Sequence, residues 1–395
     1  MAKKKEKQDA SGSGQGYLYQ FFLALCVALE KYKEDIDLEV NIENYDDIAF
    51  ESDGDPVELI QAKHYSTPKN LADSSVDLWK TLSIWIDRDK KYLKQGITLN
   101  YILASNSTYS NDSGIENLRS KIGYSRNVNK AEEILSTKAK NLIAVETADY
   151  RKKFLSLSKE KRKSLLERIT VIDATPSISD IRDYISKNYL LPVLVEHRIP
   201  LLDRFFGWWL QKIIELLKDS TKTIPVRVIS KKLQDLSYEF HNENLPIDFL
   251  DSEPDWDIDW DKRVFVHQVK FITDKSTRIQ NAIRDFHRAF DQRSRWARED
   301  LLIDDEVETY EKKLVDEWQR FKDSVLDELA PESDEDKKKV GVKIYNWMEQ
   351  NANIPLRTHV KEEYVARGSY QMLSDEKRVG WHPDFVDRLK ELLEE

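Results

Sequence analysis

Four residues in one short stretch could together hold a divalent metal ion and hydrolyse a phosphodiester bond. The acidic residue Asp47 is followed by the triplet Gln61-Ala62-Lys63. Carboxylate, amide and backbone carbonyl oxygens are ligands that Mg²⁺ accepts, so Asp47, Gln61 and the Ala62 carbonyl form a candidate ligand set in which Mn²⁺ could replace Mg²⁺. The Lys63 ammonium could orient the attacking water, help to deprotonate it, and offset charge on the phosphate. This pattern fits a metal-dependent nuclease site; the alternative is a structural hairpin with a buried Gln61 and a surface Lys63.

Asp46 competes with Asp47 for the metal, and strand geometry favours Asp47. Alternate residues of a strand share a face, so Gln61 and Lys63 lie on one face. If residues 52–56 form a five-residue loop, Asp47 lies opposite Gln61, whereas a loop with an even number of residues would place Asp46 there. The odd loop also gathers an apolar set on the other face, formed by Ile48, Phe50, Ile60 and Ala62. We therefore expect Asp47 to bind the metal and Asp46 to support it.

The elements around these residues indicate an α/β domain. Hydrophobic periodicity predicts a helix over 17–33, strands over 38–42, 47–51, 57–63 and 97–104, and a helix over 75–92. The order helix, three strands, helix, strand predicts a mixed sheet flanked by helices. Residues 1–16, rich in Lys, Ser and Gly, are expected to form a flexible basic arm.

The second half of the chain has a different pattern. Two prolines, Pro192 and Pro200, bracket an apolar stretch, and helical periodicity dominates beyond them. We therefore expect an α/β domain over 17–195 and a mainly helical domain over 196–395.

Composition excludes several classes of protein. The single cysteine excludes a disulfide scaffold and a Cys-based zinc site. No apolar stretch reaches the roughly 20 residues that cross a bilayer, so we expect no membrane contact and a cytoplasmic location.

The net charge of −10 (62 basic against 72 acidic residues) is localised. Residues 299–336 hold 16 acidic and four basic residues, a balance of −12, so the rest of the chain sums to +2. Nucleic-acid binding by the remainder stays open, and the sequence does not identify the residues that would contact DNA. Five arginines over 284–298 could bind a DNA backbone, but the adjoining acidic stretch favours internal ion pairs or a partner surface.

The N-terminal motifs resemble those of a nuclease family. Gly16-Tyr17-x-Tyr19-Gln20, Asp46-Asp47-Ile48 and Leu59-Ile60-Gln61-Ala62-Lys63-His64 resemble the restriction-endonuclease-like domain of bacterial anti-phage effectors, including those of CBASS systems. The resemblance is to the PD-(D/E)xK superfamily, in a variant with Gln61 in place of the second acid. It implies an Mg²⁺-dependent endonuclease that acts on double-stranded DNA, with Asp47, Gln61 and Lys63 catalytic and Gln20 a supporting residue on a helix.

The C-terminal motifs resemble a second family. They look like the C-terminal domain of ABC-three-component systems; the motifs are Phe265-Val266-x-Gln268, the helix 282–290, Gln292-Arg293-Ser294-x-Trp296, Glu317-Trp318, Gly368-Ser369-Tyr370-x-Met372-Leu373 and Val379-Gly380-Trp381-His382-Pro383. The two halves together resemble the LmuA-type nuclease effectors of Lamassu defence systems.

The combined resemblance implies partners and regulation. It implies an SMC-like coiled-coil ATPase and a small accessory subunit, docked through the C-terminal domain. It also implies that the complex restrains the nuclease until release or self-assembly, with a homo-oligomer as the active form. The alternative is a catalytically inert adaptor that keeps the fold and serves as a scaffold subunit of the same kind of complex.

Overall fold

The computed structural model describes residues 10–65, 67, 70–111, 113–119, 126–219, 221–257, 259–351 and 354–394. The chain forms two compact units. The first comprises residues 1–191 and 202–235, and the second comprises residues 192–201 and 236–395. Residues 1–9 of the expected basic arm lie outside the described residues, whereas residues 10–16 already belong to the first helix.

The first unit is built on a mixed sheet of six strands in the order β7-β5-β3-β2-β1-β8. The strands β3, β5 and β7 are parallel, and the other neighbours are antiparallel. The strands are β1 (Glu39–Ile42), β2 (Ile48–Ser52), β3 (Asp55–Lys63), β5 (Asn100–Ser105), β7 (Ile169–Ile172) and β8 (Ile224–Pro225), with β4 (Asn70–Leu71) and β6 (Thr108–Tyr109) in a separate pair. The helices are α1 (Ala10–Glu34), α2 (Val76–Leu93), α3 (Val128–Asn141), α4 (Ala148–Ser156), α5 (Lys159–Glu167), α6 (Ile178–Tyr189), α7 (Arg198–Lys218) and α8 (Val226–Glu239), with short 3₁₀ turns at Ile115–Leu118 and Val145–Thr147. A further 3₁₀ turn at Val195–His197 lies in the segment 192–201 of the second unit.

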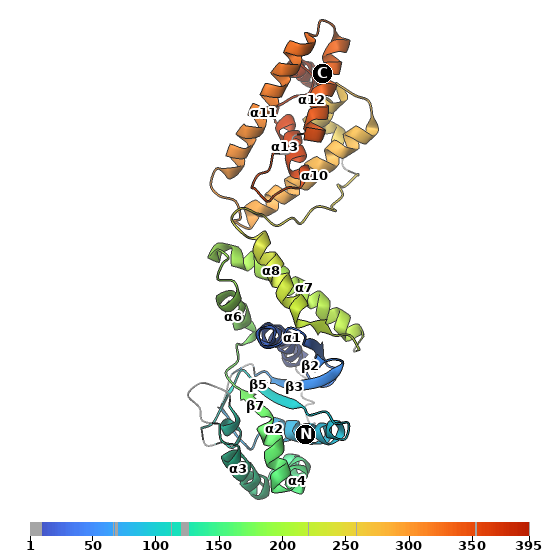
Figure 1. Cartoon of the computed structure of the whole chain (residues 1–395). Coiled ribbons are helices and arrows are strands. Elements are labelled where there is room, and N and C mark those ends of the chain that lie inside the picture. The colour runs from blue at the N-terminus through green and yellow to red at the C-terminus, as the bar shows by residue number, and fades with distance from the viewer. Residues whose placement is uncertain are drawn as a thin grey trace, which may run out of the picture. The chain divides into compact units, whose positions relative to one another are not determined.

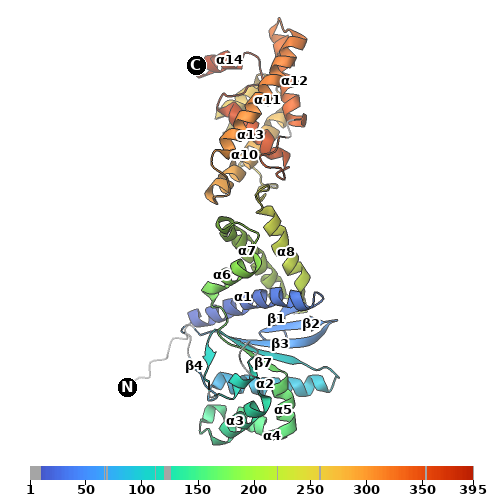
Figure 2. The ribbon, with the colours of Figure 1, turned by 60° about the vertical axis from the view of Figure 1, so that its left-hand side comes forward.

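Helices cover both faces of this sheet, as Figures 1 and 2 show. On one face lies α1, whose Lys31 pairs with Glu58 of β3 at 3.1 Å. On the other face lies α2, whose Trp79 packs in one apolar cluster with Leu59 of β3. A strand buried on both faces contributes side chains to two cores. The expected α/β class and the order of helix, three strands, helix and strand are confirmed.

The hairpin of β2 and β3 has the expected register, but its turn differs from the expected loop. The turn is a two-residue Asp53-Gly54 turn, with φ of +53° and +84°, instead of a five-residue loop. Positive φ at both central residues is the geometry that matches the twist of paired strands. Such an even turn alone would place Asp46 opposite Gln61. A bulge that leaves Val57 between the pairs Phe50↔Glu58 and Glu51↔Pro56 shifts the register by one residue.

Beyond the bulge the ladder runs as the sequence predicts. The last pair is Ile48↔Ile60, so the next position sets Asp47 against Gln61. The predicted apolar set of Ile48, Phe50, Ile60 and Ala62 is buried on the face that α1 covers. The bulge therefore decides which aspartate faces Gln61.

The division of the chain differs from the expected boundary at residues 195 and 196. Strand β8 pairs with β1, and residues 202–235 pack with the first unit. The Trp209 indole of α7 donates a hydrogen bond of 2.8 Å to the Phe21 carbonyl of α1. Helix α7 thus buries one side against the layer formed by α1.

The second unit is helical, as expected for the C-terminal half. Its helices are α9 (Val264–Lys270), α10 (Ser276–Arg298), α11 (Glu306–Leu329), α12 (Asp334–Asn351), α13 (Glu363–Asp375) and α14 (Phe385–Glu394), with a 3₁₀ turn at Trp260–Lys262. The helices α10 and α13 approach closely at Gly368, where a Cβ would lie 2.0 Å from the Asp285 carbonyl oxygen and 2.4 Å from the Ala289 Cβ. Among the described residues, no helix is both long and apolar enough to cross a membrane.

We predict that Gly368→Ala lowers the free energy of unfolding of the second unit by about 1–3 kcal/mol, because the added methyl group has no space between α10 and α13. Gly207→Ala on α7 is the matched control, since nothing lies within 4 Å of its Cβ position, and it should stabilise by about 0.4–1 kcal/mol. Urea unfolding of the full chain measures both. Equal stability of the two variants would contradict the close crossing.

Candidate active site

Four of the predicted site residues, Asp46, Asp47, Gln61 and Lys63, line one hollow of about 310 Å³ in the first unit. The segment between β1 and β2, the end of β3, and α2 form its walls. Its lining residues are Glu43, Asn44, Tyr45, Asp46, Asp47, Gln61, Lys63, Lys80, Ile84 and Arg88. We call this cavity the Asp47 hollow. The structure thus brings together Asp46, Asp47, Gln61 and Lys63.

Asp47 is fixed by hydrogen bonds to the end of β3. Its Oδ2 atom accepts the Ala62 backbone N–H at 2.9 Å and also the side-chain amide of Gln61. Its Oδ1 atom receives no hydrogen bond from the described residues. One oxygen of this carboxylate is therefore held by the strand, and the other keeps its lone pairs for a ligand.

Asp46 is held by the other wall of the hollow. Its Oδ2 atom accepts the Trp85 indole N–H at 2.9 Å and pairs with the Arg88 guanidinium at 3.2 Å. Its Oδ1 atom accepts the Asp47 backbone N–H at 3.2 Å. Asp46 therefore ties α2 to the backbone of the residue that presents the free carboxylate oxygen, which is a supporting position.

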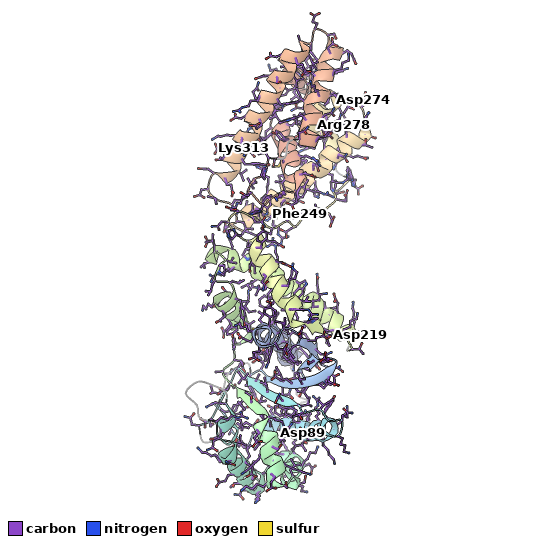
Figure 3. All side chains as sticks on the ribbon, in the orientation of Figure 1. Asp89, Asp219, Phe249, Asp274, Arg278 and Lys313 are labelled. Atoms are coloured by element: carbon purple, nitrogen blue, oxygen red, sulfur yellow. The ribbon has the colours of Figure 1, made fainter. Side chains whose placement is uncertain are left out.

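Helix α2 is itself anchored beneath the sheet. Asp89, labelled in Figure 3, accepts a hydrogen bond of 2.9 Å from Arg168. Arg168 also donates to the Leu99 carbonyl at 2.9 Å, next to the start of β5. The wall that carries Trp85 and Arg88 is therefore fixed relative to the strands.

The acidic side chains of the hollow favour a bound cation. Burial raises the pKa of Asp46 and of Asp47 above the usual carboxyl value, although Arg88, Trp85 and the Ala62 N–H act in the opposite direction. Burial also raises the pKa of Glu43, and the charges of Asp47 and Asp46 add to this shift. A cation near these groups would relieve the cost of keeping them ionised.

Two lysines in the hollow have no partner among the described residues. Lys63, at the end of β3, and Lys80, on the exposed side of α2, form no hydrogen bond or ion pair with any described residue, and both line the hollow. The charge of Lys63 acts on both Asp46 and Asp47 to lower their pKa. The ammonium group of Lys63, close to the carboxylate that could bind a metal ion, is therefore available to a negatively charged substrate.

The donor set fits a hard cation such as Mg²⁺ or Mn²⁺. Asp47 Oδ1 is free, and Ala62 directs its backbone N–H to the edge where Asp47 lies. The N–H and C=O of a strand residue point to the same edge, so the Ala62 carbonyl lies on that edge as well. The Gln61 amide turns its nitrogen to Asp47, and a half-turn of the amide would offer its oxygen instead. Among the described residues, no group of three His, Cys, Asp or Glu side chains is arranged for a metal, so amide and carbonyl oxygens would have to complete the set.

Gln20 is not brought to the Asp47 hollow. It lies on α1, which covers the opposite face of the sheet, where Tyr19 packs against His64 at 4.9 Å between ring centroids. Gln20 does not line the hollow, and its buried Oε1 atom has no hydrogen-bond partner among the described residues. The supporting role of Gln20 stays a prediction, and Gln20 does not contact the Asp47 hollow in this structure.

The residues of α2 that face the hollow were missed at the level of sequence. Lys80, Ile84 and Arg88 are spaced four apart and therefore share one face of the helix. This spacing was a usable signal, because the opposite face carries Trp79, Leu82 and Ile86. What the sequence could not supply was the knowledge that this face turns toward the β2–β3 hairpin.

The C-terminal motif residues are packing residues of the second unit. Gln292, fully buried, accepts the Asp248 N–H at 2.8 Å and the Tyr364 hydroxyl at 3.1 Å, and it donates to the Pro246 carbonyl at 3.1 Å. Gln268 donates to the Ser374 carbonyl at 2.6 Å. These side-chain amides form hydrogen bonds with buried backbone groups of the loops that would otherwise lack a partner.

The arginines of α10 form internal ion pairs, the alternative that the adjoining acidic stretch favours. Arg284 and Arg288 pair with Glu253 at 2.9 and 3.2 Å. Arg293 pairs with Glu311, and Arg295 pairs with Glu299 at 3.0 Å. Four of the five are therefore used within the unit.

We predict that Mn²⁺ binds at Asp47 and raises the melting temperature of the full chain. At ten times its dissociation constant, a ligand stabilises the folded state by about 1.4 kcal/mol, which corresponds to roughly 3–5 °C for a unit of this size. Asp47→Asn should remove this shift. Asp53→Asn is the control, because Asn tolerates the left-handed conformation of this turn residue. An equal Mn²⁺ shift in the Asp47→Asn variant would exclude this site.

Comparison with known proteins finds one similarity, within the C-terminal part of the chain. Residues 265–389 match the family model of C-terminal domain 7 of the ABC-three component (ABC-3C) systems. The match lies entirely within the second unit and covers less than half of the chain. No curated protein matches the chain. Residues 265–389 therefore resemble C-terminal domain 7 of the ABC-three component systems, and the match supports membership of the chain in such a system.

Proposed function

We propose that this chain is a metal-dependent endonuclease that cuts double-stranded DNA. One observation carries the proposal: a single hollow combines the Oδ1 atom of Asp47 with the ammonium group of Lys63, and neither has a partner among the described residues. A carboxylate that can take a divalent cation and a lysine beside it are the two elements that phosphodiester hydrolysis requires. The resemblance of the Asp47 and Gln61-Ala62-Lys63 segments to restriction-endonuclease-like domains supports the same reaction.

Each residue of the hollow has a distinct role in this proposal. Asp47, Gln61 and the Ala62 carbonyl hold Mg²⁺, which when bound polarises the phosphate and acidifies water. Lys63 orients the attacking water and stabilises the negative charge that develops on the phosphate. Asp46 fixes the backbone of Asp47 through its Oδ1 atom, at 3.2 Å. Lys80, on the opposite wall, attracts the phosphate backbone into the hollow.

The C-terminal domain supports a role in a defence complex. A C-terminal domain of ABC-three component type fits a nuclease effector that is docked on an SMC-like ATPase and a small accessory subunit. Unrestrained DNA cutting would harm the host, so the complex holds the nuclease inactive until release or self-assembly. Cutting both strands needs two active sites, and the active form is therefore a homo-oligomer.

The second candidate is a catalytically inert adaptor of the same complex. The observation in its favour is that the Gln61 amide donates a hydrogen bond to Asp47. A carboxylate at position 61 would instead add a negative charge that strengthens metal binding. An adaptor would keep the sheet and the C-terminal domain and would cut no DNA under any condition.

We predict that the purified chain, free of its partners, nicks supercoiled plasmid with Mg²⁺ and not with a chelator. Lys63→Ala should lower the rate ~10²-fold or more, because one stabilising charge is lost from the transition state. Its melting temperature should stay unchanged, since Lys63 has no partner among the described residues. Lys94→Ala, an exposed residue at the end of α2, is the control. Equal cleavage by the Lys63→Ala and wild-type proteins would remove Lys63 from the mechanism, and an inactive wild type would favour the adaptor.

A further inference from the structure

The Asp47 hollow contains a further carboxylate that the metal site described above does not use. Glu43 follows the last residue of β1 and lines the hollow together with Asp47 and Gln61. The side chain of Glu43 is exposed, and no described residue forms a hydrogen bond or an ion pair with its carboxylate. Glu43 is therefore an acidic group of the hollow that is available to a ligand.

Strand pairing sets Glu43 against Asp47. The ladder of β1 and β2 ends with the pair Ile42↔Ile48, so the next position joins Glu43 and Asp47. The Glu43 backbone N–H donates a hydrogen bond of 3.3 Å to the Asp47 carbonyl, which holds the two residues opposite each other where β1 ends. Residues directly opposite each other on antiparallel strands have Cβ atoms about 4.5–5.5 Å apart. The two acidic side chains therefore begin close together, and both reach the hollow.

Gln61 extends this row of side chains onto β3. Asp47 stands against Gln61 across the next pair of strands, so Glu43, Asp47 and Gln61 follow one another over β1, β2 and β3, which Figure 2 shows side by side. Gln61 is only 7% exposed, and its amide nitrogen donates to Asp47. Its Oε1 atom accepts no hydrogen bond from the described residues. The buried side chain of Gln61 thus keeps one oxygen for a metal ion or for a water molecule bound to it.

The charge balance of the site favours a second acid. Mg²⁺ in proteins is commonly bound through one or two carboxylates, with water in the remaining positions. Because Gln61 is neutral, Asp47 alone would place one negative charge beside a doubly charged cation. Asp46 does not supply the other charge, since its Oδ2 atom already pairs with Arg88. Among the described residues that line the hollow, Glu43 is the remaining carboxylate.

We propose that Glu43 is a further ligand of the divalent cation, directly or through one water molecule, and that it supplies the negative charge that Gln61 lacks. A cation between Glu43 and Asp47 also relieves the repulsion of like charges at opposed positions of two strands. Among the described residues, no three carboxylate, imidazole or thiol side chains converge on one point, so this pair of acids acts with the oxygens of Gln61 and Ala62. The inference rests on the metal site of the proposed function and adds a residue to it.

Calorimetric titration of Mn²⁺ into the full chain tests this role. Glu43→Gln should raise the dissociation constant for Mn²⁺ about tenfold or more, a loss typical of groups that support a bound metal. Asp55→Asn, which removes an exposed carboxylate at the start of β3 and outside the hollow, should leave the dissociation constant unchanged. Equal Mn²⁺ binding by the Glu43→Gln and wild-type proteins would overturn the role of Glu43 and leave the Asp47 site intact. A wild-type chain that binds no Mn²⁺ would overturn both.

The melting temperature separates a metal ligand from a residue that only supports the fold. With a chelator present, Glu43→Gln should melt at the same temperature as the wild type or higher, because the change removes one of two like charges at opposed positions. A clear decrease would show that the Glu43 carboxylate has a partner within the fold and would refute the proposal. With Mn²⁺ added at one fixed concentration, the melting temperature should rise less for Glu43→Gln than for the wild type, since the variant binds the ion more weakly. Equal increases would refute the proposal as well.

Discussion

The hydrogen bond from the Ala62 backbone N–H to Asp47 Oδ2, 2.9 Å long, is the contact on which the N-terminal hollow depends. It exists only because β2 and β3 pair in a register that sets Asp47 against Gln61. A slip by one residue would carry every side chain of the hairpin to the other face of the sheet. The apolar residues Phe50 and Ile60 would then leave the layer beneath α1, so burial on both faces protects the register.

The sequence predicts the sheet and much of the hollow, and it fails where local conformation decides. The apolar patterns of β3 and α2 suffice to place Gln61 and Lys63 at a strand end. The turn at Asp53-Gly54 and the bulge at Val57 escape such reasoning, because the turn depends on two residues with positive φ and the bulge on one extra residue in β3, and apolar periodicity reports neither. The two features compensate each other: a two-residue turn and one bulged residue together give the same register as the expected five-residue loop.

Tertiary contacts account for the other differences. Strand β8 is too short for any periodicity to predict, yet its pairing with β1 draws residues 202–235 into the first unit. Gln20 has the right residue type, but α1 packs on the face opposite the hollow. In the second unit the motifs that contain Gly368 and Gln292 serve close packing and loop hydrogen bonds, which sequence patterns do not separate from binding.

The central claim is that Asp47, Gln61 and the Ala62 carbonyl bind one divalent cation beside Lys63. Anomalous diffraction from crystals soaked in millimolar Mn²⁺ tests this most directly. The account predicts a manganese peak within coordination distance of Asp47 Oδ1, absent from crystals of the Asp47→Asn protein. Soaked wild-type crystals with no manganese peak in the Asp47 hollow, and with Asp47 and Gln61 still joined by their hydrogen bond, would contradict it.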